Sequence, residues 1–116
     1  MKIGDESLDQ IALFKWIRLQ PKISPFIFHI AGERKCSPQY GAFLKKMGCM
    51  AGVADIFVAM PKGQYHGLWI ELKSLKGRMT PKQTEFLENM RTQGYMAVCA
   101  KGFETAKVII ESYLEL

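Results

Sequence analysis

The sequence contains no run of 18 apolar residues, and its N-terminus lacks the apolar core of a signal peptide. We therefore expect a protein that does not span a membrane and that works in the cytoplasm. It also lacks internal repeats, low-complexity tracts and linker-like stretches. Residues 1–116 are accordingly predicted to form a single domain.

Cysteine is scarce, and its spacing argues against a zinc site. The three cysteines, Cys36, Cys49 and Cys99, form no C-x-x-C pair and stand near no histidine cluster. We predict reduced thiols that serve as small, buried or half-buried side chains.

Basic residues are in excess. Lysine and arginine total 16, against 11 aspartates and glutamates, which gives a net charge of +5. This balance favours an anionic partner, nucleic acid first and an acidic membrane surface second, although many basic soluble proteins share it. Hydrophobic residues make up 48% of the chain, enough for a core. A second copy would add stability to a domain of this size.

Apolar periodicity and turn residues predict a mixed sheet with helices packed against it, an α/β fold. The predicted helices cover residues 6–19, 40–47, 81–93 and a last stretch after Gly102, and the predicted strands cover residues 26–30, 55–60, 68–74 and 95–100. In the first helix the apolar residues at helical spacing are Leu8, Ile11, Ala12, Trp16 and Leu19. Ser7 with Gln10 predicts a capping box at its start.

Charged residues interrupt the strand at 68–74. Because side chains alternate along a strand, Glu71 and Lys73 should share the face opposite Leu72. If the preceding hairpin turns around Gly63, Asp55 lies opposite Glu71, about 5 Å away at Cβ. The alternative is an ordinary Glu–Lys pair on a half-exposed strand.

Two carboxylates and an ammonium at one place suit phosphodiester hydrolysis. Carboxylate oxygens hold hard cations such as Mg²⁺ or Mn²⁺, which polarise a phosphoryl oxygen and lower the pKa of a bound water. Lys73 could orient that water or neutralise charge on the phosphate. The pattern therefore predicts a metal-dependent nuclease.

Two further polar residues have alternative roles. Gln83 shares an apolar helical stripe and could point into the site, or it could close a capping box with Thr80. Glu6 could complement the dipole of the first helix or add a third acidic group to the metal site.

Four ordered blocks resemble the VRR-NUC domain, the virus-type replication-repair branch of the PD-(D/E)XK nucleases. They are Gly-Val-Ala-Asp-Ile-Phe at 52–57, Gly-Leu-Trp-Ile-Glu-Leu-Lys at 67–73, Gly-Arg-Met-Thr-Pro-Lys-Gln at 77–83 and Gly-Tyr at 94–95. The resemblance implies a restriction-endonuclease-like α-β-β-β-α-β-α core. It implies Asp55 and Glu71 as Mg²⁺ or Mn²⁺ ligands, the Leu72 carbonyl as a further candidate ligand, and Lys73 as the catalytic lysine.

Other positions match the family to different degrees. Glu6 matches the family's N-terminal acidic position, which implies a catalytic and metal-binding role. Gln83 matches the family's catalytic glutamine on the helix after the E-x-K strand. Ala54 replaces the usual proline, which removes no ligand. Gly32-Glu33 stands where the family has Asn-Glu, so no role is assigned there. His29 is interpreted as a satisfied strand histidine.

The resemblance also implies a DNA substrate, in a bacterial or virus-infected host cell. Lys76, Arg78 and Lys82 follow the E-x-K strand and could contact phosphates, or could belong to a solvated loop. We expect an endonuclease for branched DNA such as four-way (Holliday) junctions. A nuclease for flaps, nicks or ends, and a non-catalytic DNA-binding module, are the alternatives. A homodimer is expected, with the first helix or residues 31–53 in the contact.

Overall fold

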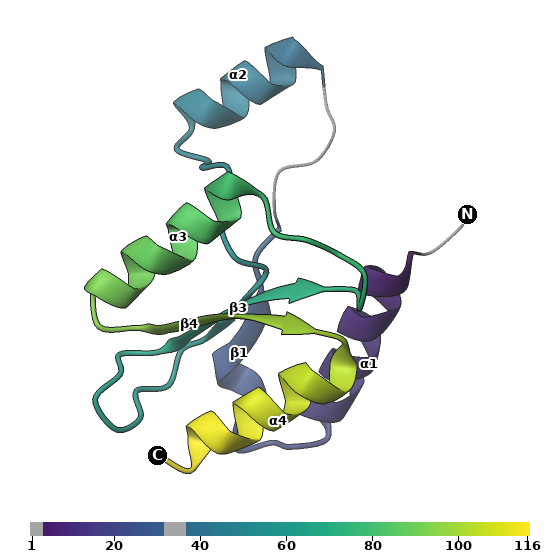
Figure 1. The fold of residues 1–116 in the computed structure, drawn as a ribbon, viewed down its shortest axis with the longest axis vertical. Coiled ribbons are helices and arrows are strands. Elements are labelled where there is room, and N and C mark those ends of the chain that lie inside the picture. The colour runs from purple at the N-terminus through teal and green to yellow at the C-terminus, as the bar shows by residue number, and fades with distance from the viewer. Residues whose placement is uncertain (1–3, 32–36) are drawn as a thin grey trace.

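The computed structural model describes residues 4–31 and 37–116 (Figure 1). Cys36 and the Gly32-Glu33 pair lie outside these residues. The elements, in chain order, are α1 (Asp5–Arg18), a 3₁₀ turn η1 (Ser24–Phe26), β1 (Ile27–His29), α2 (Pro38–Lys46), β2 (Ile56–Val58), β3 (Leu68–Lys73), α3 (Pro81–Thr92), β4 (Met96–Lys101) and α4 (Phe103–Leu114). This order is the predicted one, with β1 and β2 shorter than expected.

The four strands form one mixed sheet in the order β1-β2-β3-β4. β1 and β2 are antiparallel, as are β2 and β3, which a hairpin joins. β3 and β4 are parallel, because α3 carries the chain back across the sheet between them. The prediction of a mixed central sheet flanked by helices is confirmed.

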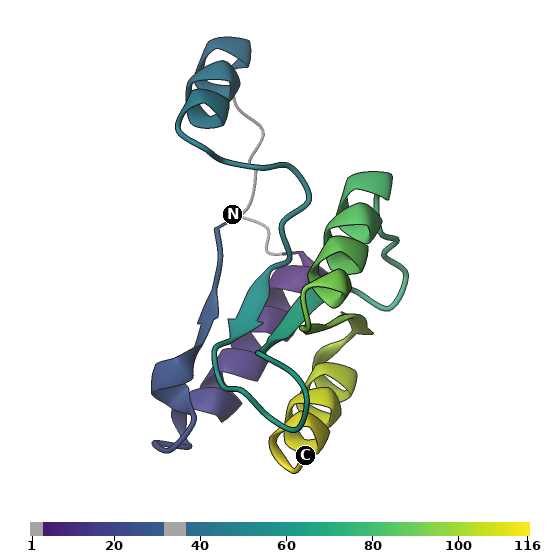
Figure 2. The same ribbon diagram turned by 90° about the vertical axis from the view of Figure 1, so that its left-hand side faces the viewer.

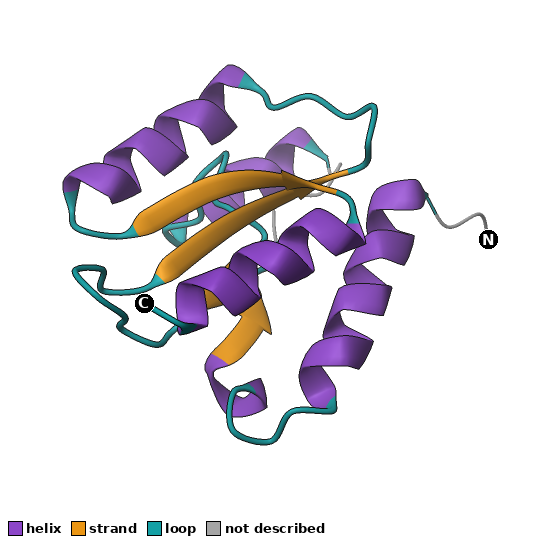
Figure 3. Ribbon diagram, turned by 60° about the horizontal axis from the view of Figure 1, so that its bottom comes forward, coloured by secondary structure: helices purple, strands orange, loops and turns teal. Residues whose placement is uncertain are grey.

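Helices cover both faces of the sheet (Figure 3). α1 and α4 pack on one face, over a large core that includes Leu13 and Ile17 of α1 and Ile70 of β3. α3 covers the other face, where Phe86 and Leu87 pack with Ala97 and Trp69. Both faces of β3 are therefore covered, so its charged residues lie between layers.

The predicted apolar face of α1 is correct only in part, since Trp16 packs against the core. Leu13 and Ile17 are its buried residues, whereas Leu8, Ile11 and Leu19 are exposed. The helix is apolar on several sides, so spacing alone could not select the buried side. The expected Ser7–Gln10 capping box is also wrong, because the N-cap is Gly4 and no side chain caps the helix.

α2 stands apart from the layers (Figures 1 and 2). None of its residues is buried, although its N-cap Ser37 accepts a hydrogen bond from the Tyr40 N–H. Cys49, just beyond it, is exposed, so the prediction of a covered side chain is wrong there, while Cys99 on β4 is half-buried as expected.

Within the described part of the chain, no helix combines the length and the apolar character that crossing a membrane requires.

Candidate active site

Hydrogen bonds to both the side chain and the main-chain carbonyl of Asp55 fix its position. Asp55 directly precedes β2. Because Ile56 pairs with Ile70 in the antiparallel β2–β3 register, the next position of that register places Asp55 opposite Glu71. Its Oδ2 accepts a hydrogen bond from the Leu72 N–H at 2.9 Å. Its carbonyl oxygen lies 2.8 Å from Nδ1 of His29, so the prediction of a satisfied strand histidine is confirmed.

Gly52 allows the segment before Asp55 to approach α3 closely. Its φ is +84°, a left-handed conformation that glycine adopts without strain. A Cβ at this position would lie 2.5 Å from the Lys82 carbonyl oxygen. The first turn of α3 is thereby brought beside Asp55.

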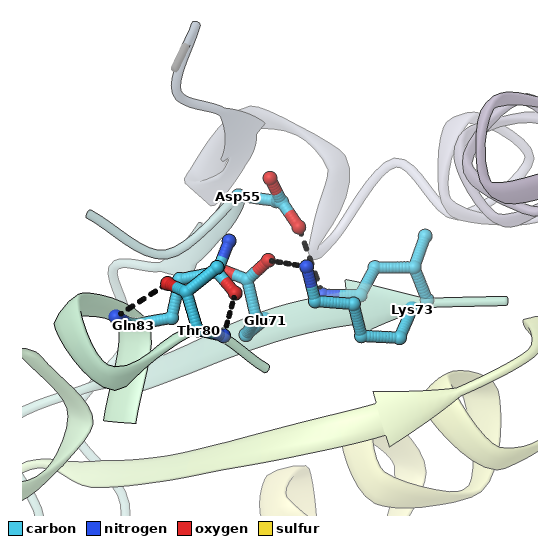
Figure 4. A network of polar contacts seen from close by, with 6 residues as sticks. Asp55, Glu71, Lys73, Thr80 and Gln83 are labelled. Carbon is cyan, nitrogen blue, oxygen red and sulfur yellow. Dashed lines mark hydrogen bonds and ion pairs between the residues drawn. The ribbon is translucent and has the colours of Figure 1, made fainter. Parts of the chain in front are cut away.

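Three carboxylates converge at this point. Ligand oxygens of Glu6, Asp55 and Glu71 all lie within 4.8 Å of one another. Lys73 adds its ammonium 3.4 Å from Oε2 of Glu71 (Figure 4). α1, the start of β2, and β3 each contribute, so the cluster exists only in the folded chain.

The Glu71–Lys73 pair is not an ordinary surface pair. The side chain of Glu71 is 2% exposed and that of Lys73 is 11% exposed. The alternative of a half-exposed strand is therefore wrong, because α3 packs over this face of the sheet and Glu6 of α1 reaches the same cluster.

The electrostatics of the cluster favour a bound cation. Burial, and then the Asp55 carboxylate, raise the pKa of Glu71 to about 8, although Lys73 opposes the shift. Burial and Asp55 also raise the pKa of Glu6. Oε1 of Glu71 is buried without a hydrogen-bond partner among the described residues. Three hard oxygen donors, one of them unsatisfied, fit a divalent cation such as Mg²⁺ or Mn²⁺.

The comparisons with known proteins agree with this geometry. The family model of the VRR-NUC domain matches residues 8–104. The chain belongs to the VRR-NUC family. A solved structure of a VRR-NUC domain protein is 32% identical, with a TM-score of 0.84, over 100% of this chain and 93% of that one. No curated protein shows significant similarity to the sequence.

The family places this chain among nucleases of the PD-(D/E)XK fold. DNA is accordingly the class of substrate, and the acidic cluster could hold the divalent metal of such a nuclease domain.

In this VRR-NUC domain Gln83 forms the capping box that was one of its two predicted roles, and its position leaves the other role open. Its Oε1 accepts the Thr80 N–H at 2.9 Å, and its own N–H bonds to Thr80 Oγ1 at 3.2 Å, which completes a capping box. Gln83 also lines the same pocket as Glu6, Asp55 and Glu71. Its oxygen is occupied by the cap, so its amide NH₂ is the group left to serve a substrate.

The predicted DNA contacts divide between two places. Lys82 lines the acidic pocket, while Lys76 and Arg78 are exposed on the loop after β3. Sequence reasoning missed Lys101, which pairs with Lys73 in the β3–β4 register and so shares its face of the sheet. The sequence shows a basic residue at the end of the last strand, but only the parallel β3–β4 register shows that it lies beside Lys73.

Metal binding is expected to stabilise the fold. Mg²⁺ or Mn²⁺ at about 100 times its Kd should raise the unfolding free energy by about 2.7 kcal/mol, or Tm by roughly 10 °C. Thermal unfolding with increasing metal measures this. Glu71→Gln should lose most of the shift, whereas Glu88→Gln, on the exposed side of α3, should keep it. An equal shift in both variants would remove Glu71 from the ligand set.

Without metal, the same variant should change the pH dependence of stability. The pKa of Glu71 rises from an ordinary 4.5 to about 8 on folding. Since the folded state then binds a proton that the unfolded state has lost, stability should fall as pH rises from about 4.5 to about 8. Glu71→Gln should remove this part of the fall and be the more stable protein at pH 8.

Proposed function

We propose that the chain is a single-domain, Mg²⁺- or Mn²⁺-dependent endonuclease that hydrolyses phosphodiester bonds in branched DNA such as four-way junctions. The convergence of Glu6, Asp55 and Glu71 beside Lys73 supports the reaction most strongly. The net charge of +5 supports an anionic substrate. The cytoplasm of a bacterial or virus-infected cell is the expected location.

Glu6, Asp55 and Glu71 would hold the cation, with the Leu72 carbonyl as a further candidate. Leu72 donates its N–H to Asp55, and the N–H and carbonyl of one strand residue project to the same edge. A bound cation supplies Lewis-acid polarisation of the phosphate and acidification of water.

The chain's own side chains would then position the reacting groups. Lys73 keeps its ammonium beside Glu71 and can donate a hydrogen bond to a phosphate oxygen as negative charge grows there. The amide NH₂ of Gln83 can orient the attacking water or the phosphate from the α3 side. Burial of Glu71 and Lys73 strengthens these interactions by excluding water.

A non-catalytic DNA-binding module of the same fold is the alternative from another class. A buried carboxylate with an unpartnered oxygen lowers the stability of the protein, and a module that only binds DNA gains nothing from it. The arrangement therefore favours the enzyme.

Labelled DNA substrates distinguish these functions. The panel contains a four-way junction, a flap, a nicked duplex, a plain duplex and a single strand, each incubated with Mg²⁺, Mn²⁺ or EDTA. We expect metal-dependent nicks in the junction and none with EDTA. If flaps, nicks or ends are cut in preference to the junction, they are the substrate in place of junctions. Binding without cleavage in either metal would establish the non-catalytic module.

The homodimer is part of the proposal, and α2 is its favoured contact. Tyr40 and Phe43 of α2 and Met47 at its C-cap recur at helical spacing, and all three are exposed. The Tyr40 and Phe43 rings stack on each other with their centroids 6.2 Å apart, and neither residue is buried. α1 is the weaker candidate, because Ile17 already lies in the core. A two-fold dimer would present two sites to a near-symmetric junction.

Light scattering at micromolar concentration is expected to give about twice the 13.2 kDa chain mass. Phe43→Glu should give the mass of one chain, because a charge would enter the apolar contact. Leu19→Glu, at a leucine that is 81% exposed and lies outside α2, is the control and should stay dimeric. A wild-type mass of one chain would reject the dimer, and a dimeric Phe43→Glu would reject α2 as its contact.

A further inference from the structure

A second cavity, of about 630 Å³, is lined by Asp5, the chain neighbour of Glu6 in the acidic pocket. It lies between the N-terminal half of α1, the loop after β3 and the start of α4. Leu8, Leu75 and Phe103 provide apolar surface, and Lys76 and Lys101 are the basic residues of its lining. Its size is within the range of about 300–1,000 Å³ typical of small-ligand sites.

The main chain links this cavity directly to the Glu71–Lys73 pair. Leu75 follows Lys73 by two residues, a reach of at most about 7 Å. Lys101 is paired with Lys73, and the Gly102 N–H bonds to the Lys73 carbonyl at 2.9 Å. Successive nucleotides in one strand rise about 3.4 Å, so a base one or two nucleotides from a phosphate at Lys73 can reach the cavity.

The charges of the cavity favour a neutral ring over a phosphate. Asp5, Asp9 and Glu104 also line it, and Oδ1 of Asp9 accepts the Phe103 N–H at 3.3 Å. These carboxylates repel phosphate, but they can accept hydrogen bonds from the amino groups of nucleobases. Proteins insert apolar side chains, leucine among them, against base faces that unstacking exposes.

Leu75 is the exposed apolar residue of this basic loop. Its side chain is 76% exposed, although it follows directly from the buried end of β3. Exposure of a leucine on a loop with Lys76 and Arg78 is unfavourable in water, but it suits contact with a base when DNA is bound.

We propose that this cavity holds an unpaired nucleobase of the substrate strand, one or two nucleotides from the phosphate to be cut, with Leu75 against the face of the base. The inference rests on the proposed DNA cleavage and defines its selectivity. A base that is already unpaired enters without the few kcal/mol needed to unstack a paired one. At a branch point the stacking between base pairs is interrupted, so a base there leaves its pair at a lower cost than a base inside a continuous duplex. Junctions and other branched DNA would thereby be preferred over plain duplex.

A fluorescent base tests the proposal. 2-Aminopurine is placed next to the mapped cleavage position in a junction, and in a fully paired duplex of the same sequence. Its emission is weak when it is stacked between bases. Wild-type protein in EDTA should increase the emission in the junction and leave the duplex unchanged. Leu75→Ala should abolish the increase and weaken junction binding by about tenfold. Leu19→Ala, with a leucine 81% exposed at the far end of α1, should match wild type.

The possible outcomes separate the nucleobase site from the proposed nuclease function. If junctions are cleaved but the emission does not change, or if Leu75→Ala equals Leu19→Ala, the nucleobase site is rejected and the nuclease stands. An equal increase in the paired duplex also rejects selectivity for an unpaired base. If wild-type protein neither binds nor cleaves any DNA in the panel, the proposed function fails and the base site fails with it.

Discussion

Asp55→Asn and Glu71→Gln are each expected to lower the DNA cleavage rate by at least about a thousandfold, because each removes a charge that holds the cation. Asparagine can still accept the hydrogen bond that Leu72 donates to Asp55, so the fold should be kept. DNA affinity should stay at or above that of wild type, since phosphate contacts by lysine and arginine dominate binding and neither variant adds negative charge.

Single-turnover cleavage and a binding titration in EDTA separate these two quantities. Glu88→Gln removes the same type of charge from an exposed position on α3 and should cleave like wild type. Cleavage within tenfold of wild type by Asp55→Asn or Glu71→Gln would exclude that residue from the reaction.

Lys73→Ala is expected to reduce the cleavage rate at saturating DNA by about 100- to 1,000-fold, while affinity changes by no more than a few-fold. The side chain of Lys73 is 11% exposed and its ammonium lies beside Glu71, so we expect it to contact the reacting phosphate and not the wider DNA surface. Its removal also leaves the charge of Glu71 without its cationic partner, and a melting curve should accompany the kinetics.

Lys82→Ala provides the contrast. Lys82 is exposed at the rim of the same pocket, so its loss should weaken DNA affinity and leave the saturated rate close to wild type. If Lys73→Ala behaves like Lys82→Ala, with the loss confined to affinity, Lys73 is a phosphate contact and its catalytic role is wrong.

The local signals of the sequence were sufficient for most of the fold. Thr80, Pro81 and Gln83 predicted the start of α3, and the structure forms that capping box. Alternation along β3 predicted that Glu71 and Lys73 share a face, and the β2–β3 register continues to place Asp55 opposite Glu71. These features depend on residues that are neighbours in the chain or joined by one hairpin, so local stereochemistry specifies them.

Features that depend on packing between distant segments were not available from the sequence. The buried side of α1 was predicted only in part, because several of its sides are apolar and only docking on the sheet selects Leu13 and Ile17. The exposure of α2 was not predicted either, since its apolar spacing is that of a helix with a buried face.

For the site, the sequence by itself determined the chemical groups: an aspartate before one strand, and a glutamate and lysine two apart on the next. The tertiary structure decided that Glu6, 49 residues before Asp55, completes the acidic cluster, that Lys101 stands beside Lys73, and that Glu71 is buried with its pKa raised. The physical reason is that a side chain's identity is local, whereas its dielectric environment and its charged neighbours are set by the segments that pack over it.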